Sequence, residues 1–210
     1  MEFREVVKSR RMVRSYDPDR AVPPETIGGL LDLAIRAPSA GFSQGWDFLV
    51  LRTPTDTGRF WAATAEDGDH NPWLKGMQSA PTLILCLSDR ERYLDRYAEP
   101  DKGWPDRDAA RWPVPYWDVD TGMAGLLILL GAVDDGLVSC FFGVPPEHQT
   151  AMLAEFKAPA DRRIVGVVSL GYQAPDVADR RSPSLRRGRR PATEVAHDGN
   201  FGTRWARPAQ

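Results

Sequence analysis

The chain has 210 residues, of which 42% are hydrophobic and 27% charged, a balance typical of a globular domain and not of a disordered chain. Its formal net charge of -2 argues against a protein that coats nucleic acid or an anionic membrane through bulk charge. The N-terminus has no apolar segment typical of secretory signals, and the longest apolar run, about 123–133, is well short of the roughly 20 residues that cross a bilayer. We therefore expect a cytoplasmic protein with no membrane span.

Hydrophobic periodicity predicts helices and short buried strands in alternation along most of the chain. In chain order we expect helices and strands as follows: helix at about 3–9, helix at about 24–37, strand 46–51, helix at about 57–65, strand 81–88, helix at about 120–135, strand 137–142, helix 145–156 and strand 163–172. The helix at 120–135 is apolar on nearly every side, which indicates that it is buried all round or held in a subunit interface. The alternation predicts an α/β or α+β fold.

Two segments depart from this alternation. Residues 89–117 are dense in Arg, Asp, Pro and aromatic residues with little periodicity, which is typical of a lid or binding loop; a surface excursion packed by its own aromatics is the alternative. Residues 173–210 are too poor in apolar residues to bury a face of their own, so they lie across a partner subunit or form a disordered extension. We expect a core at 1–172, a lid or insert at 89–117, and an extension at 173–210 that wraps the partner subunit.

Arginines gather near both ends of the chain. Arg10, Arg11 and Arg14 lie beside a turn, and their planar guanidinium groups match phosphate oxygens. The second group lies in the tail and comprises Arg180, Arg181, Arg186, Arg187, Arg189 and Arg190. Each group alone is typical of solvated surface charge, and the tail group could also meet nucleic acid, although it lacks interleaved aromatic residues. If the two ends meet in space, they form one site for the phosphate of a cofactor.

The loop at 38–46 joins a helix to a strand and is rich in small residues, which let backbone groups approach a flat ligand. Within it, Gln44 offers both a donor and an acceptor. The histidines lack metal-ligand spacing, and no GxSxG, GxGxxG, Walker or HExxH pattern is present, so the sequence supports no metal site, P-loop or hydrolase triad. Cys86 and Cys140 lie inside apolar runs, where we expect reduced, buried thiols.

Taken in order, RRMVRSY, VPPETIGGLLDLAIRAPSAGFSQGWDFLVL, GLVSCFFGV and RRGRRP make the chain resemble the nitroreductase superfamily of FMN enzymes over almost its whole length. The resemblance implies an α+β fold, a three-layer α/β/α sandwich with a central mixed sheet flanked by helices. It also implies a homodimer that packs through long central helices and exchanges its C-terminal extension. Two FMN sites would then lie at the dimer interface.

The resemblance also implies site residues. Arg10, Arg11, Met12 and Arg14 would lie at the FMN phosphate or its surroundings, joined from the tail by Arg187 and Arg189. The flavin would be lined by Pro38, Ser39 and Ala40 of the partner subunit, by Phe42 and Gln44 beside the ring, and by the backbone of Phe142 and Gly143 near N5.

Three positions depart from the family pattern. Met12 stands where many members have a serine that donates to the phosphate, and Phe42 stands where many have an asparagine that bonds the ring. Gly45 replaces the usual proline before Trp46. One phosphate contact is then lost, and the pyrimidine edge is held differently or by Gln44. The resemblance still implies FMN, but it does not specify the flavin's potential or its substrate.

The implied activity is NADH- or NADPH-driven two-electron reduction of a small organic acceptor, such as a nitroaromatic or a quinone, by a ping-pong mechanism. Arg10 would stabilise charge near N1 and O2 of the flavin, the backbone near Phe142 or Gly143 would donate to N5, and Tyr16 or water would supply the proton. Two other activities stay open: a flavin store or regulator with little turnover, and a dehydrogenase or oxidase of a biosynthetic intermediate. The sequence does not choose between NADH and NADPH, or between FMN and a deazaflavin, and it indicates neither a nucleic-acid nor a membrane partner.

Overall fold

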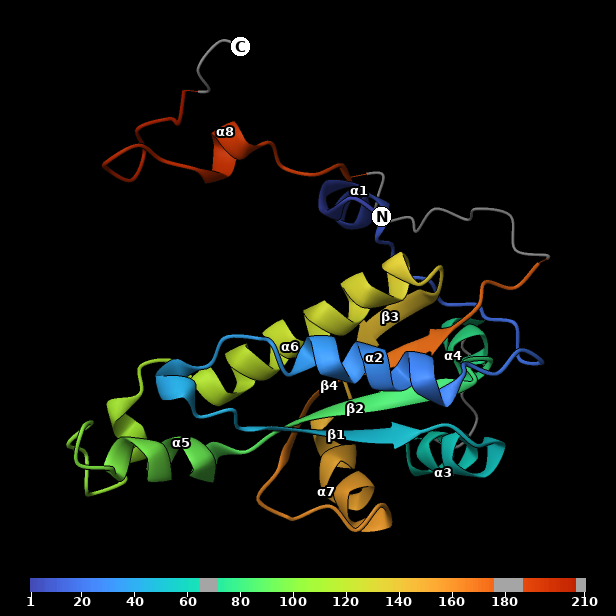
Figure 1. Cartoon of the computed structure of the whole chain (residues 1–210), viewed down its shortest axis with the longest axis horizontal. Helices are drawn as coiled ribbons and strands as arrows, with labels where there is room; N and C mark the ends of the chain where they lie inside the picture. The colour runs from blue at the N-terminus through green and yellow to red at the C-terminus, as the bar shows by residue number, and fades with distance from the viewer. Residues whose placement is uncertain (65–71, 176–186, 207–210) are drawn as a thin grey trace. The chain divides into compact units, whose positions relative to one another are not determined.

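The computed structural model describes residues 1–64, 72–175 and 187–206, and the chain divides into two compact units, Met1–Pro175 and Asp176–Gln210. The first unit holds a four-stranded sheet with helices on both faces (Figure 1). In the second unit, the described residues form one short helix, α8 (Ala192–Val195), and a bridge between His197 and Arg204. The fold that positions a site is therefore that of the first unit.

The sheet forms the middle layer of the first unit. Its strands are β1 (Trp46–Leu51), β2 (Thr82–Ser88), β3 (Val138–Phe142) and β4 (Arg163–Gly171), in the order β1-β2-β4-β3. Neighbouring strands are antiparallel, and among the described residues the parallel component of the sheet is an isolated bridge between Met12 and Ser139. Every residue of β2 is buried because helices cover both faces of this central strand.

Helices form the two outer layers. One face of the sheet is covered by α2 (Pro24–Ala34) and α6 (Tyr116–Asp134), as Figure 1 shows. The opposite face is covered by α3 (Pro54–Thr64), α4 (Pro72–Gln78) and α7 (Pro146–Glu155). Alternate side chains of β2 serve the two cores, because successive residues of a strand point to opposite faces. The α+β class and the three-layer α/β/α sandwich are confirmed, whereas the sheet expected to be mixed is antiparallel in all its strand pairs.

α6 is the central helix of the fold. By length and composition alone it would pass as a membrane span, but its buried residues, from Asp120 to Ala132, pack against the sheet and α2. Val119 and Leu126 are exposed on the same face of this helix, one heptad apart. The expectation of a central apolar helix at about 120–135 is thus confirmed, with a start one turn earlier.

In the first unit, two α-helices lie where the sequence predicts none. α4 begins at Pro72, and α5 (Arg90–Ala98) opens the segment that the sequence indicates as irregular. α5 is polar over most of its surface and has few apolar residues, but Asp89 caps it by accepting a hydrogen bond from the Arg92 N–H at 3.3 Å. The helix expected at 57–65 begins earlier, at Pro54, because Thr53 accepts from the Asp56 N–H.

The remainder of the 89–117 segment packs on its own aromatic rings, as the alternative interpretation predicts. It contains one short 3-10 helix, η2 (Ala109–Arg111). The Trp112 ring lies at the centre, with the Tyr97 ring at 4.5 Å and the Trp104 ring at 5.6 Å between centroids. A lid role for the segment stays a prediction.

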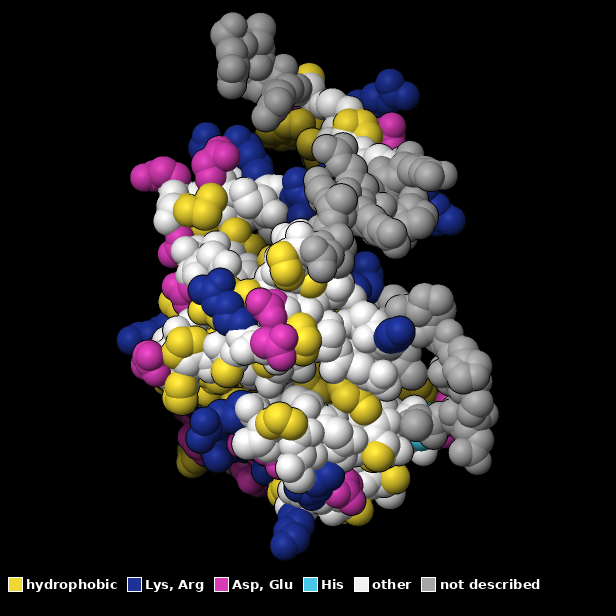
Figure 2. All heavy atoms as spheres, turned by 90° about the vertical axis from the view of Figure 1, so that its right-hand side faces the viewer, with side chains coloured by type: hydrophobic (Ala, Val, Ile, Leu, Met, Phe, Trp, Pro, Cys, Tyr) yellow, Lys and Arg dark blue, Asp and Glu magenta, His cyan; other side chains and the backbone are white. Residues whose placement is uncertain are grey.

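Charged side chains are mixed on the surface. Figure 2 shows Lys and Arg interspersed with Asp and Glu over one face, without a continuous basic surface. A protein that binds nucleic acid through that face would need clustered positive charge.

Candidate functional site

The arginine-rich turn runs from the end of α1 (Phe3–Ser9) onto the edge of β3. Met12 bridges to Ser139, and the Val13 N–H donates to the Ser139 carbonyl oxygen at 2.9 Å. α4 packs against the same stretch so closely that a Cβ added at Gly76 would lie 2.2 Å from the Arg14 carbonyl oxygen. The sheet edge and α4 therefore fix the backbone on which Arg14 is carried.

Three polar atoms at this edge are buried without a hydrogen-bond partner among the described residues: Arg10 Nη1, Arg14 Nε and Ser139 Oγ. We call these three residues the arginine corner. Neither guanidinium has a carboxylate within ion-pair distance in the described part of the chain, whereas many other arginines of the fold do. Buried charged donors are normally paired. Arg14 Nη1 donates to the Met12 carbonyl oxygen at 3.3 Å, so among the described residues the free donors are Arg14 Nε and Arg10 Nη1. Two guanidinium groups without a carboxylate partner among these residues, beside a hydroxyl, match the oxygens of a dianionic phosphate.

The corner also acts on the thiol of Cys140. Burial raises the pKa of Cys140, while the charges of Arg14 and Arg10 oppose that rise. The thiol is free and buried, as is that of Cys86, which confirms the expectation for both cysteines. The two arginines thus create a positive field at Cys140, in the middle of β3.

Arg11 and Met12 are placed differently from their neighbours. Arg11 is exposed, and its Nη1 donates to the carbonyl oxygens of Lys8 at 2.5 Å and Arg10 at 3.0 Å, at the end of α1. Met12 Sδ accepts from the Phe141 N–H at 3.4 Å. Of the four N-terminal residues that the sequence assigns to the phosphate, Arg10 and Arg14 are therefore the two with buried, unpartnered donors.

The loop at 38–45 has an unusual backbone. Gly41, Phe42 and Gln44 have φ values of 62°, 59° and 50°, in the left-handed region that costs an L-residue about 1 kcal/mol or more. The Gln44 N–H donates to Ser39 Oγ at 3.0 Å, and the Ala40 N–H donates to Asp120 Oδ2 at 2.8 Å. Phe42 is 75% exposed. Pro38 and Gln44 are also exposed, so the loop presents its tip outward.

Within one chain, the arginine corner and this loop lie at different ends of α6. The N-terminal amine pairs with Asp134 in the last turn of α6, and α1 packs beside it. The loop bonds to Asp120 near the start of the same helix. The helix between Asp120 and Asp134 is about 20 Å long at 1.5 Å per residue, and Figure 1 shows the loop helix η1 (Ala40–Phe42) and α1 at opposite ends of it. A single chain does not bring the two halves of the predicted site together.

The end of β3 provides the third part of the predicted site. The Phe142 ring stacks on the Trp61 ring, with centroids 5.8 Å apart, and so belongs to the core. Gly143 follows the strand, and no atom lies within 4 Å of the position that a Cβ would take there. The backbone at this point can therefore be approached closely by a ligand.

The tail arginines belong to the second unit. Arg187 and Arg189 are exposed, and Arg190 Nη2 donates to the Glu194 carbonyl oxygen at 3.2 Å. The remaining tail arginines, Arg180, Arg181 and Arg186, lie outside the described residues. The meeting of Arg187 and Arg189 with the N-terminal arginines stays a prediction.

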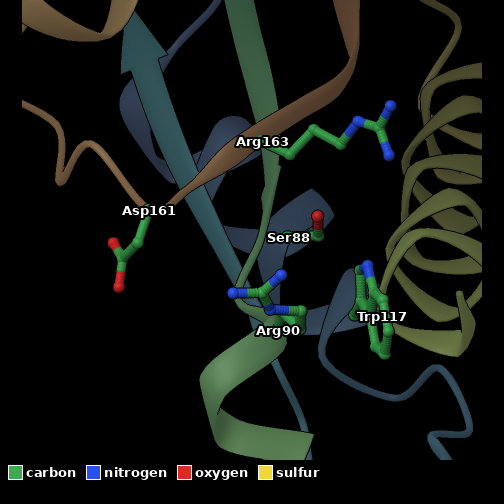
Figure 3. A pocket seen from close by; sticks show the side chains of 5 residues that line it. All are labelled: Ser88, Arg90, Trp117, Asp161 and Arg163. Atoms are coloured by element: carbon green, nitrogen blue, oxygen red, sulfur yellow. The ribbon is translucent and has the colours of Figure 1, made fainter. Parts of the chain in front are cut away.

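A cavity of about 230 Å³ opens at the other end of the sheet and is lined by Ser88, Arg90, Trp117, Asp161 and Arg163 (Figure 3). Its charges are paired. Arg163 Nη1 lies 2.9 Å from Asp118 Oδ2, Ser88 Oγ donates to Asp118 Oδ1 at 2.6 Å, and Arg90 Nη2 lies 2.9 Å from Glu91 Oε1. We call this the Ser88 cavity, and it contains none of the residues predicted for the site.

Tyr16, one of the two expected proton donors, lies in the core. Its hydroxyl is 2.7 Å from the Val13 carbonyl oxygen and 2.7 Å from Ser169 Oγ, and its side chain is 1% exposed. Burial raises the pKa of the Tyr16 hydroxyl above its ordinary value, so it stays protonated. This tyrosine secures the arginine-rich turn against β4 and does not reach a surface site. Within the described ranges, no group of His, Cys, Asp and Glu is arranged to hold a metal ion.

Sequence reasoning missed Ser139 and Asp120. Ser139 is one of the few polar residues in an otherwise apolar strand, which is a weak signal of a polar role. Asp120 is a carboxylate at the start of an apolar helix, but only the fold shows that it is 2% exposed and bonded to the loop. Its partner cannot be inferred from spacing because eighty residues separate it from Ala40.

Known proteins are similar to this chain in sequence and in fold. The profile of the Nitroreductase family matches residues 7–172. A protein of Archaeoglobus fulgidus, described as a candidate NADH dehydrogenase/NAD(P)H nitroreductase, is 30% identical over 173 residues, which cover 81% of this chain and 85% of that protein. A 4-nitrobenzoate reductase of Nocardioides sp. is 32% identical over 201 residues, covering 81% and 80%. A candidate nitroreductase of Desulfovibrio desulfuricans, solved in complex with FMN, superposes with a TM-score of 0.69 at 21% identity, covering 96% of this chain and 98% of that one.

Proposed function

The chain belongs to the nitroreductase family, and from that premise we propose that it is an FMN-dependent oxidoreductase which uses NADH or NADPH to reduce a small organic acceptor. The acceptor class is nitroaromatic or quinone-like, and the cycle is ping-pong, with the acceptor replacing the oxidised nicotinamide. Relatives described as an NAD(P)H nitroreductase and a 4-nitrobenzoate reductase support the donor and the acceptor class. An FMN complex of a structure with the same fold supports the cofactor.

The observation that carries the proposal is the arginine corner. Arg10 Nη1, Arg14 Nε and Ser139 Oγ are buried donors without partners in the described part of the chain. A phosphomonoester supplies several anionic acceptor oxygens, and pairing them with guanidinium groups offsets the cost of burying the charges. The residues present therefore fit the phosphate of FMN. The proposal adds Arg187 and Arg189 of the tail, whose exposed side chains are available for the same phosphate.

Bound FMN supplies hydride transfer between the nicotinamide and the acceptor. The chain's own residues bind and orient the flavin and exclude water from it. Arg10 and Arg14 would hold the phosphate end, and their positive charge would favour reduction of the flavin. The backbone at Gly143, directly after Phe142, can be approached closely, and the proposal assigns to this stretch the bond to the ring. Water supplies the proton, because Tyr16 is enclosed in the core.

A homodimer completes the site. Apolar side chains are exposed on α1, α2 and α6, at Phe3 and Val7, at Leu33, and at Val119 and Leu126, and such faces pack against a second surface. In an isologous dimer with α6 of each subunit antiparallel to that of its partner, the loop of one subunit reaches the arginine corner of the other. Pro38, Ser39, Ala40, Phe42 and Gln44 of one subunit then line the flavin held by its partner.

The test begins with the purified protein. We expect a yellow protein whose visible spectrum shows a bound flavin, with FMN as the released mass, and whose absorbance bleaches when NADH or NADPH is added anaerobically. Addition of a nitroaromatic or a quinone should restore the colour. Analytical ultracentrifugation should give twice the chain mass of 23.4 kDa. A colourless protein that does not take up added FMN would overturn the proposal.

The same titration separates the other flavin activities. A yellow protein that neither nicotinamide bleaches is a flavin store or regulator. A flavin that is reduced only by an organic donor identifies a dehydrogenase or oxidase. A released mass other than FMN, such as a deazaflavin, would change the cofactor but leave the phosphate site. Two buried free thiols favour a cytoplasmic location, where thiols stay reduced.

A further inference from the structure

Asp120 is a buried carboxylate that no cation accompanies. It is 2% exposed, and no Lys, Arg or His of the described residues lies within ion-pair distance of it. Its Oδ2 accepts two hydrogen bonds, from the Ala40 N–H at 2.8 Å and from the Tyr93 hydroxyl at 2.8 Å. Burying an unpaired carboxylate is costly. Its bonds join three elements that are far apart in sequence: the loop at 38–45, α5 and α6.

The loop is in turn packed against α5. Arg96 Nε donates to the Gly41 carbonyl oxygen at 2.9 Å. A Cβ at Gly41 would lie 2.6 Å from the Tyr97 ring, and a Cβ at Gly45 would lie 2.4 Å from the Tyr93 ring. Two glycines therefore let α5 approach the loop backbone, and the contact holds Phe42 and Gln44 in their left-handed conformations.

The same two tyrosines of α5 also belong to a cluster of aromatic rings, which we call the aromatic cluster: Tyr93, Tyr97, Trp104, Trp112, Tyr116 and Trp117. Trp112 contacts the rings of the other members at 4.5 to 6.0 Å between centroids. Tyr93 belongs both to this cluster and to the Asp120 bonds. The cluster is thus connected to the loop by the Tyr93 hydroxyl, which bonds Asp120, and by the Tyr97 ring, which packs against Gly41.

We propose that Asp120 and Tyr93 are positioning residues, which transmit the packing of the 89–117 segment to the loop that lines the partner's flavin. The inference rests on the proposed function only in naming what the loop lines. Neither residue touches the cofactor. Because both donors bond the same oxygen, an asparagine can keep both bonds and an alanine can keep neither. Tyr93→Phe removes the phenol donor and leaves the ring in the cluster.

Asp118 provides a matched control. It is the same residue type in the same turn of α6. Its carboxylate also accepts two hydrogen bonds, one from the Ser88 hydroxyl at 2.6 Å and one from Arg163 Nη1 at 2.9 Å. Its partners lie at the Ser88 cavity and not at the loop. Asp118→Ala therefore removes comparable bonds from the same helix without releasing Ala40.

The first measurement is the rate of FMN release from the holoprotein, followed by the recovery of flavin fluorescence. Loss of one or two bonds at the loop should raise the rate about tenfold in Asp120→Ala and about threefold to tenfold in Tyr93→Phe. The KM for the acceptor should rise while kcat changes less than twofold. Asp120→Asn should restore the wild-type rate within about twofold. Asp118→Ala should lower the melting temperature without changing the release rate.

The second measurement needs no cofactor. Hydrogen exchange of the apoprotein should show faster exchange of the Ala40 and Phe42 amides in Asp120→Ala and Tyr93→Phe than in the wild type, and unchanged exchange in Asp118→Ala. If the wild type binds no flavin, the proposed function fails, and this exchange result still decides the positioning role. Equal effects of Asp118→Ala and Asp120→Ala, or no effect of Tyr93→Phe in either measurement, would overturn the inference. If Asp120→Ala does not fold, Tyr93→Phe and Asp120→Asn decide it.

Discussion

Arginines line two regions at opposite ends of β4, and in the part of the chain that the structure describes they lack carboxylate partners in only one of the two. At the arginine corner, beside the Ser139 and Leu170 pair of the sheet, Arg10 and Arg14 keep buried donors unpaired. At the Ser88 cavity, beside the Ser88 and Arg163 pair, the guanidinium groups bond carboxylates. The cavity is lined by Arg90 and Arg163, but carboxylates already neutralise both charges. Buried donors without partners are therefore a better indicator of an anion site than a concave surface is.

The largest effect should come from removing the unpaired donors. Arg10→Ala and Arg14→Ala should each weaken FMN binding by about 1.5–3 kcal/mol, or roughly 10- to 150-fold, because each removes charge-assisted bonds to the phosphate. Fluorescence quenching of FMN by the apoprotein gives the dissociation constant. Arg90→Ala and Arg163→Ala at the Ser88 cavity are the controls and should leave it unchanged. Equal losses at both regions would erase the distinction between them.

A smaller effect should follow from disturbing the backbone beneath the corner. A Cβ at Gly76 would lie 2.2 Å from the Arg14 carbonyl oxygen, so Gly76→Ala should destabilise the fold by about 1–3 kcal/mol and displace Arg14. Thermal unfolding and the FMN dissociation constant are the measurements. Gly58→Ala in α3, where no atom lies within 4 Å of the new Cβ, should leave stability equal or higher. An unchanged FMN affinity in Gly76→Ala would show that α4 does not support the corner.

The thiols provide a third comparison, in pH dependence. Burial raises the pKa of Cys86 to about 12, whereas at Cys140 the arginines oppose the rise. A raised pKa in the folded state stabilises the protein below the unfolded value of 9.0, and this contribution is lost as pH rises toward the folded value. Urea unfolding at pH 8 and 10 should show an alkaline loss that Cys86→Ala reduces by about 1 kcal/mol and Cys140→Ala reduces by less. The reverse order would contradict a positive field at the corner.

The smallest effect should come from restoring the residue common in the family. Met12→Ser places a hydroxyl beside the corner and should tighten FMN binding by about 0.5–1 kcal/mol. The gain is limited because the Phe141 N–H loses its bond to Met12 Sδ. Isothermal titration with FMN is the measurement, with Met12→Ala as the control that removes the sulfur without adding a donor. Equal affinities of the serine and alanine variants would show that position 12 does not face the phosphate.

The sequence predicts the core elements well, and for a physical reason. β2 is a continuous apolar run because it is covered on both faces. α6 packs one side against the sheet and α2, while apolar residues on another side, Val119 and Leu126, are exposed. α5 escapes prediction because it is polar and depends on a cap at Asp89 and on ring contacts that only the fold brings together.

The site is predictable only in part. Arg10 and Arg14 are visible as a cluster in the sequence, but their difference from Arg11 depends on burial and hydrogen bonds. The loop at 38–45 is visible as a run of small residues, but its attachment to Asp120 is a contact across eighty residues. Loop and corner lie at different ends of α6, so the proposed site takes the loop from one subunit and the corner from its partner.

The central claim is that the arginine corner binds a phosphate, and the direct test compares FMN with riboflavin, which has the same ring and no phosphate. Fluorescence titration of the apoprotein with both ligands gives two dissociation constants. We predict that FMN binds at least a hundredfold more tightly than riboflavin, a preference of about 3 kcal/mol, and that Arg10→Ala with Arg14→Ala in one chain abolishes most of it. Equal affinity of the wild type for the two ligands would contradict the assignment of the corner.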